Sequence, residues 1–206
     1  MYRPEKFWNR IANKFDKLEQ KDKPTYTNII KRTKRYLNDS DIVLDLGCGT
    51  GLISLEIAGN VRMVHGVDIS TKMIEVSNRK AIERKIQNIE NVCSTIFDNR
   101  YKIGSFDIIF AFYILHLLDE PQMVLNRIFE LLKPNGFFIS AIPCLGEKPI
   151  LYNILSICGK IGVIPKVRPF KISELINIYK TGNYNIVETE CLNQKLSQYY
   201  IVAKKL

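Results

Sequence analysis

Histidine is scarce in this chain, which has only His65 and His116 among its 206 residues. Histidine-rich catalytic metal centres usually need two or three imidazoles, so such a centre is disfavoured and we expect no metal. Cysteine is sparse too, with five residues and no Cys-x-x-Cys pair: Cys48, Cys93, Cys144, Cys158 and Cys191. Their odd number and wide spread disfavour a disulfide framework and a zinc site, and predict reduced thiols in a cytoplasmic protein.

A long hydrophobic run is also missing. The longest, residues 108–118, lies between Asp107 and Asp119 and falls short of the roughly 20 residues of a membrane-spanning helix. The N-terminus leads into an amphipathic stretch instead of the apolar segment of a signal peptide, so we expect no export. Without internal repeats, low-complexity tracts or Gly/Ser linkers, the sequence predicts one domain over residues 1–206.

Charge is spread unevenly along the chain. The net charge of +9 divides into +6 for residues 1–40, −2 for residues 41–144 and +5 for residues 145–206. Basic flanks fit an anionic substrate or RNA, and the densest basic run lies at residues 31–35. The alternative is that the lysines only keep the surface soluble.

Hydrophobic spacing alternates between the period of a strand and that of a helix. The predicted strands are 42–46, 61–67, 89–94, 106–112, 137–142, 184–192 and 198–203. The predicted helices are 7–18, 26–36, 52–58, 70–85, 119–132 and 173–179. Such alternation predicts a parallel sheet with helices on both faces, and the short link between the last two strands predicts an antiparallel hairpin.

A glycine-rich loop, Asp45-Leu46-Gly47-Cys48-Gly49-Thr50-Gly51, follows the first predicted strand and opens a helix. Open α/β sheets bind nucleotides at this position. The dinucleotide fingerprint G-x-G-x-x-G needs a third glycine where this chain has Leu52. Asp45 would repel a pyrophosphate and suits a cationic amino group. The loop therefore favours a ligand other than a dinucleotide.

A second acidic residue, Asp68, ends the next predicted strand. A carboxylate at this position can accept hydrogen bonds from both hydroxyls of a ribose. A ribose without phosphates and with an amino acid attached describes S-adenosylmethionine. Asp45, the glycines and Asp68 together therefore predict an S-adenosylmethionine site.

Four segments resemble, in order and spacing, the signature segments of class I S-adenosylmethionine-dependent methyltransferases. They are VLDLGCGTG at 43–51, GVDIS at 66–70, SFDII at 105–109 and LLKPNG at 131–136. Within that superfamily, FWNRIA at 7–12, Phe15-Asp16 and LHLL at 115–118 are similar to the small-molecule branch, which includes the ubiquinone and menaquinone biosynthesis methyltransferases.

This resemblance implies an α/β fold: a Rossmann-like, doubly wound, seven-stranded and mostly parallel sheet with an antiparallel last strand and an N-terminal helical cap. It divides the domain into a cap at 1–40, a cofactor-binding core at 41–142, an insertion over the active site at 143–170, and a helix with a terminal hairpin at 171–206. The implied activity is in-line transfer of the methyl group of S-adenosylmethionine to a small molecule, which leaves S-adenosylhomocysteine. The expected acceptor is an anionic or aromatic metabolite; the alternatives are an RNA methyltransferase that uses the basic flanks and a non-catalytic module that binds S-adenosylmethionine.

The resemblance also implies roles for single residues. Asp45 and the glycines would hold the methionine moiety, Asp68 and Ile69 the ribose and adenine edge, and Thr95 with Ile96 the adenine. Phe112 and Tyr113 would flank the sulfonium, and Trp8 and Tyr26 would close over the cofactor. The full expected set is Trp8, Tyr26, Asp45, Gly47, Cys48, Gly49, Asp68, Ile69, Met73, Thr95, Ile96, Phe112 and Tyr113. Many relatives carry Gly-Asp where this chain has Ser94-Thr95.

His116 is the candidate catalytic residue, because it is the histidine near the predicted strand ends and imidazole can take a proton from an attacking oxygen or nitrogen. It also ends a very apolar segment, so the alternative is that it only packs or donates a hydrogen bond. Methyl transfer needs positioning more than acid–base chemistry, so a catalytic base is not required.

Overall fold

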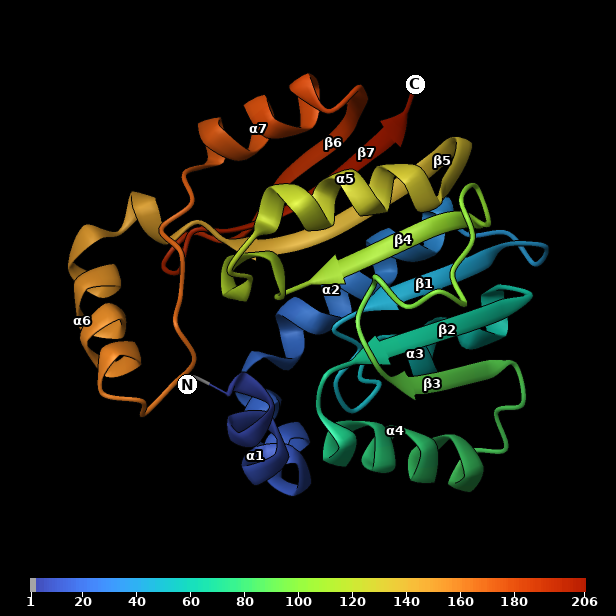
Figure 1. Ribbon diagram of the computed structural model, residues 1–206, viewed down its shortest axis with the longest axis horizontal. Coiled ribbons are helices and arrows are strands. Elements are labelled where there is room, and N and C mark those ends of the chain that lie inside the picture. Colours follow the sequence, from blue (N-terminus) through green and yellow to red (C-terminus); the bar gives the residue numbers. More distant parts are fainter. Residues whose placement is uncertain (1–2) are drawn as a thin grey trace.

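The computed structural model describes residues 3–206, so Met1 and Tyr2 of the predicted cap lie outside the described residues. Seven strands form one sheet in the order β3-β2-β1-β4-β5-β7-β6 (Figure 1). The strands are β1 (Ile42–Leu46), β2 (Met63–Asp68), β3 (Ile89–Cys93), β4 (Phe106–Phe112), β5 (Leu132–Pro143), β6 (Tyr184–Asn193) and β7 (Gln198–Lys205). Pairs from β3 to β5 are parallel, and β7 is antiparallel to both neighbours. The predicted Rossmann-like sheet is therefore confirmed.

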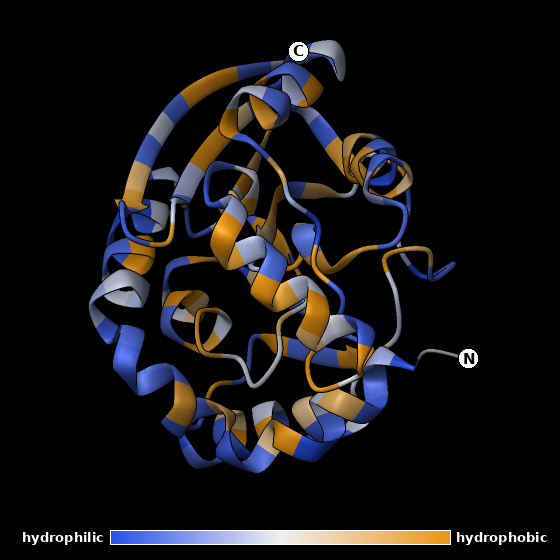
Figure 2. Cartoon of the chain, turned by 90° about the vertical axis from the view of Figure 1, so that its left-hand side faces the viewer, coloured by the Kyte–Doolittle hydropathy of each residue, from blue (hydrophilic) through white to orange (hydrophobic). Residues whose placement is uncertain are grey.

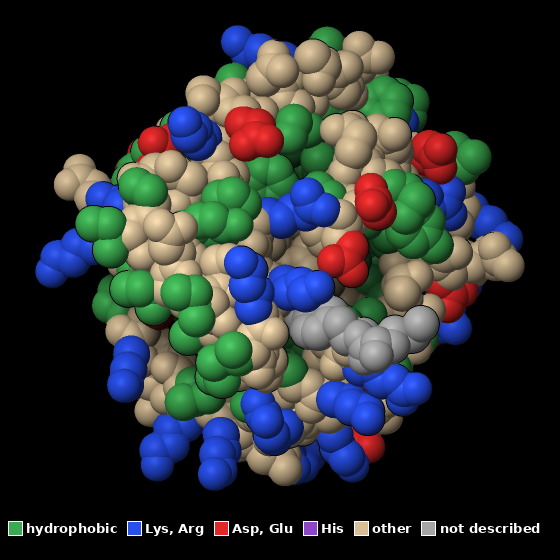
Figure 3. All heavy atoms as spheres, turned by 60° about the vertical axis from the view of Figure 1, so that its left-hand side comes forward, with side chains coloured by type: hydrophobic (Ala, Val, Ile, Leu, Met, Phe, Trp, Pro, Cys, Tyr) green, Lys and Arg blue, Asp and Glu red, His purple; other side chains and the backbone are tan. Residues whose placement is uncertain are grey.

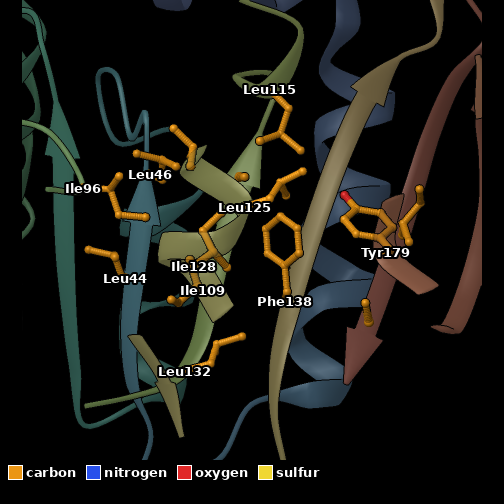
Figure 4. Close-up of a cluster of buried hydrophobic side chains, with 14 of the residues drawn as sticks. Leu44, Leu46, Ile96, Ile109, Leu115, Leu125, Ile128, Leu132, Phe138 and Tyr179 are labelled. Carbon is orange, nitrogen blue, oxygen red and sulfur yellow. The ribbon is translucent and has the colours of Figure 1, made fainter. Parts of the chain in front are cut away.

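Helices cover both faces of this sheet (Figure 1). They are α1 (Pro4–Glu19), α2 (Lys23–Thr33), α3 (Ser54–Ile57), α4 (Thr71–Glu83), α5 (Pro121–Leu131), α6 (Pro149–Lys160) and α7 (Ile172–Thr181). Side chains of α5 and α7 join the buried cluster on one face, part of which is drawn in Figure 4. Side chains of α2 and α3 join the cluster on the other. Within residues 3–206, no helix combines the length and hydropathy needed to cross a bilayer.

Strand β4 explains the long apolar run of the sequence. Ile109 and Ala111 belong to the cluster beneath α5 and α7, whereas Ile108 and Phe110 belong to the cluster beneath α2 and α3. Helices bury both faces of this strand. Apolar residues therefore occupy both of its faces, and the usual alternation of apolar and polar residues is absent. The run is therefore a central strand and the turn that follows it.

The N-terminal helix α1 packs on α4, where Ala12 meets Met73 and Val76. Its Asp16 also fixes the glycine loop: the carboxylate accepts a hydrogen bond from the Thr50 hydroxyl and forms an ion pair of 2.7 Å with Lys80 Nζ. Lys80 Nζ donates in addition to the Thr50 carbonyl oxygen at 2.8 Å. The cap helix is thus anchored to the loop that the sequence assigns to the cofactor.

Two elements differ from the sequence analysis. Strand β5 begins at Leu132, five residues before the predicted start, because Leu132 pairs with Phe106 ahead of an irregularity in β5. The predicted insertion at 143–170 contains a helix, α6, for which no element was predicted. Its boundaries carry ordinary signals, since Pro149 occupies the first turn and Gly162, with φ of 77°, follows the end.

Candidate active site

The candidate site lies where the strand order reverses, between β1 and β4, at the carboxyl ends of the parallel strands. A cavity of about 550 Å³ occupies this position. All thirteen residues expected to bind the cofactor line it, and so does His116. The structure thus brings residues from six segments of the chain to one cavity; their contacts with a cofactor stay a prediction.

The glycine loop is held at the end of β2, because the backbone N–H groups of Gly47 and Cys48 both donate to the Val67 carbonyl oxygen, at 2.8 and 3.2 Å. Gly47 has φ of 72°, and a Cβ there would lie 3.0 Å from Cγ1 of Ile114. An L-residue at this position would be strained in its backbone and would also crowd its neighbour. Glycine therefore keeps the loop tight and its backbone open to the cavity.

Asp45 is a buried carboxylate that lines the cavity. Its side chain accepts a hydrogen bond from the Ser54 hydroxyl. Burial raises its pKa to about 6, although the Ser54 bond acts in the opposite direction. At neutral pH the group is therefore mostly ionised in a poorly hydrated site, which is a favourable place for an ammonium group.

The raised pKa of Asp45 predicts a pH dependence of cofactor affinity. If an ionised Asp45 holds the ammonium group, association should weaken as the pH falls through 6, approaching about tenfold for each further unit. Titration calorimetry with S-adenosylhomocysteine between pH 5 and 8 measures this effect. Asp45→Asn should bind weakly with a flat pH profile; an Asp45→Asn profile as steep as that of the wild type would contradict the assignment.

Asp68 ends β2, and both of its oxygens are held by backbone groups. Oδ2 accepts from the Gly49 N–H at 3.0 Å, and Oδ1 accepts from the Ser70 N–H at 2.8 Å. Burial raises the pKa of this carboxyl, and the backbone hydrogen bonds oppose the rise. Each oxygen retains an acceptor position for a hydroxyl donor, so the carboxylate is oriented before a ribose arrives.

The next wall of the cavity follows β3. Ile96 is buried there, and the Thr95 hydroxyl accepts a weak hydrogen bond from the Phe97 N–H at 3.3 Å. The Ser94 hydroxyl donates to Asp98 at 2.7 Å, and Asp98 does not line the cavity. This wall thus offers hydroxyls and apolar side chains.

Aromatic and acidic side chains also line the cavity. The rings of Tyr26 and Tyr113 lie 5.7 Å apart, and the Tyr26 hydroxyl donates to Glu19 Oε2 at 2.8 Å. Tyr113 has a left-handed backbone with φ of 57°, and its buried hydroxyl has no hydrogen-bond partner among the described residues. Strained backbone of this kind concentrates at functional sites.

Two more lining residues carry a buried polar atom without a partner in the described part of the chain: Oε1 of Gln198 and Nδ1 of His116. Burial lowers the pKa of His116 to about 4, so its imidazole is neutral at physiological pH. Unpaired buried polar atoms are costly, which favours a ligand that pairs with them. Gln198 lies on β7, and no sequence motif marks it.

Charge in the cavity is opposite in sign to that of the whole chain. Its acidic lining residues are Glu19, Asp22, Asp45, Asp68 and Asp119, and no Lys or Arg occurs among the described residues that line it. Glu19 and Asp22 were missed by the sequence analysis, because they lie at the junction of α1 and α2. Burial raises the pKa of Glu19.

Comparison with known proteins assigns the chain to a family. A methyltransferase domain family matches residues 37–199. A ubiquinone biosynthesis O-methyltransferase of Coxiella burnetii (strain RSA 331) is 29% identical over 154 residues, which are 71% of this chain and 64% of that protein. The uncharacterized methyltransferase YcgJ of Bacillus subtilis is 27% identical over 64% of this chain and 52% of its own length.

Solved structures agree in fold. The YcgJ crystal structure superposes with a TM-score of 0.74 at 19% identity over 88% of this chain and 97% of that one. The putative methyltransferase bound to the Haloferax volcanii Trm112 activator gives 0.79 at 14% identity over 99% of both chains. At such identities these likenesses show the fold alone, and the chain spans about two thirds or less of the two curated relatives. By the family match over most of its length, the chain belongs to the methyltransferase domain family.

Proposed function

We propose that this protein transfers the methyl group of S-adenosylmethionine to a small molecule that binds in the same cavity. The observation that carries the proposal is the lining of that cavity: besides the glycine loop, Asp45 and Asp68, it contains Glu19, Asp22 and Gln198, which add polar groups beyond the expected cofactor set. S-adenosylmethionine supplies an electrophilic methyl on a sulfonium whose charge disappears on transfer. The task of the chain is therefore to position both reactants and exclude water.

The cofactor half is assigned by charge and shape. Ionised Asp45 would hold the ammonium group, and Asp68 would accept the ribose hydroxyls. Thr95 and Ile96 would receive the adenine, and Tyr113 would adjoin the sulfonium. The remaining contacts would come from Trp8, Tyr26, Gly47, Cys48, Gly49, Ile69, Met73 and Phe112.

The acceptor half favours a neutral or cationic aromatic molecule. An anionic acceptor would face Glu19, Asp22 and Asp119 with no basic lining residue to offset them in the described cavity. The same charge argues against RNA, because phosphates are bound by Lys and Arg. The name ubiquinone biosynthesis O-methyltransferase, carried by the relative in Coxiella burnetii, supports a hydroxylated aromatic acceptor.

Removing two negative charges should change which acceptor is preferred. In the variant Glu19→Gln with Asp22→Asn, kcat/KM for an aromatic acid relative to its uncharged analogue should rise about tenfold, because repulsion in a poorly hydrated cavity falls. Glu56→Gln, an exposed carboxylate that does not line the cavity, is the matched control. An unchanged ratio in the double variant would contradict the acidic acceptor site.

Methyl-labelled S-adenosylmethionine tests the proposal directly. Incubation with phenols, catechols, aromatic amines, aromatic acids and RNA should release S-adenosylhomocysteine and label a small hydroxylated or amino aromatic. Label that enters RNA alone, with activity falling steeply as salt rises, would support the RNA alternative. Cofactor binding without any labelled product would support the non-catalytic module.

A further inference from the structure

Helix α6 presents an apolar face that nothing in the described chain covers. Ile150, Ile154 and Ile157 follow one another at spacings of four and three residues and are 78%, 56% and 60% exposed. Ile161 and Val163, just beyond the helix, are 69% and 54% exposed. Residues at these spacings share one side of a helix. Single exposed apolar residues are ordinary, but a continuous stripe marks an interaction surface; we call these five residues the isoleucine stripe.

The helix contributes little to the core of the protein. Among its described residues only Gly159 is buried, and α6 stands at the edge of the molecule, away from the sheet (Figure 1). Figure 2 shows it crossing the side turned toward the viewer, with hydrophobic residues along its length. Its apolar composition therefore has a use other than packing on the sheet.

The segment around the stripe carries charge of one sign. Residues 148–173 contain no Asp or Glu and five basic residues: Lys148, Lys160, Lys166, Arg168 and Lys171. On this side of the molecule, hydrophobic side chains are bordered by Lys and Arg in the lower left part of Figure 3. An apolar stripe with basic residues around it is the pattern of a helix that lies in the interface of an anionic membrane.

We propose that α6 docks this protein on an anionic membrane surface, with the isoleucine stripe among the lipid headgroups and the side chains of Lys148, Lys160 and Lys171 on the phosphates. Twelve residues are too few to span the bilayer, so the helix lies parallel to its surface. A symmetric contact with a second copy is disfavoured, because it would bring the two basic segments together.

Docking would place the cavity near the membrane. Ile164, Pro165 and Val167, which directly follow the stripe, line the cavity. The chain that meets the lipid thus continues into the wall of the candidate active site. The docking itself does not depend on the proposed function, since it rests on the exposed stripe and the charge around it.

Vesicle co-sedimentation of the full chain tests this proposal. The wild type should partition onto vesicles that contain phosphatidylglycerol and bind much less to pure phosphatidylcholine. Ile154→Glu with Ile157→Glu should reduce partitioning onto the anionic vesicles at least about tenfold, because it puts charge into the apolar face. Lys148→Gln with Lys160→Gln should also reduce binding and weaken its dependence on salt.

The matched control is Ile82→Glu with Ile103→Glu. These isoleucines are 78% and 74% exposed but lie on α4 and in the loop before β4. The control should bind vesicles like the wild type, and circular dichroism should show all variants folded. Absence of wild-type binding to anionic vesicles would overturn the proposal, as would equal losses in the stripe and control variants. Sedimentation that shows a dimer abolished by the stripe variant, without vesicle binding, would assign the surface to a second copy instead.

Discussion

Replacing Asp68 with alanine is expected to weaken the binding of S-adenosylhomocysteine about 30- to 1,000-fold, which corresponds to about 2–4 kcal/mol for the loss of two charge-assisted hydrogen bonds. The carboxylate is already oriented by the N–H groups of Gly49 and Ser70. The substitution therefore removes a prearranged ribose acceptor and also releases one anchor of the glycine loop. Titration calorimetry measures the change.

Two variants separate the loss of the ribose acceptor from the loss of the anchor of the glycine loop. Asp68→Asn keeps one acceptor oxygen and should lose less affinity than Asp68→Ala. Asp107→Ala removes a comparable carboxylate that accepts from the Ile42 N–H at 2.9 Å and pairs with Lys133, but that does not line the cavity. It should lower stability without a matching loss of affinity. If Asp68→Ala bound S-adenosylhomocysteine as tightly as the wild type, the ribose assignment would fail.

Replacing His116 with alanine is expected to lower kcat about 100-fold while the affinity for the cofactor stays unchanged. His116 lines the cavity, and Nδ1 of its buried imidazole has no hydrogen-bond partner among the described residues. A neutral imidazole can accept the proton of an acceptor hydroxyl, which becomes strongly acidic as the new carbon–oxygen bond forms. Steady-state kinetics on an identified acceptor, combined with calorimetry, separates this effect from a loss of binding.

The pH profile adds an independent check. Because burial lowers its pKa to about 4, His116 is essentially neutral at pH 6 and above. It should therefore cause no loss of kcat between pH 8 and pH 6, where an ordinary histidine base would become protonated. His65→Ala is the control, because His65 lies on β2, outside the cavity. Full turnover in His116→Ala would remove the base and leave a mechanism of positioning alone.

The sheet could be predicted from the sequence because its signals are local. Apolar residues of β4 lie on both faces of the sheet, and the glycine loop directly follows β1. Asp68 ends β2, at the short distance along the sequence from the glycine loop that a strand–helix–strand unit allows. The start of β5 was wrong because Pro134 to Gly136 look like the end of a helix. There, Asn135 has φ of 63° and the strand continues through the irregularity.

The acceptor end of the cavity could not be predicted in the same way. Glu19 reaches it because α1 packs on α4, and Gln198 reaches it because β7 inserts between β5 and β6. The positions of Glu19 and Gln198 both depend on tertiary contacts between segments that are far apart in the sequence. Helix α6 is a different case, since Pro149 and Gly162 mark its ends and its isoleucines recur at helical spacing, so the sequence did carry signals for it.

Calorimetric titration of the purified protein with S-adenosylmethionine, S-adenosylhomocysteine and NAD tests the central claim most directly. The acidic, glycine-lined cavity predicts micromolar binding of the first two ligands and no detectable binding of NAD, whose pyrophosphate would face Asp45. Tight binding of NAD with no response to the other two would contradict the account and leave only the fold in place.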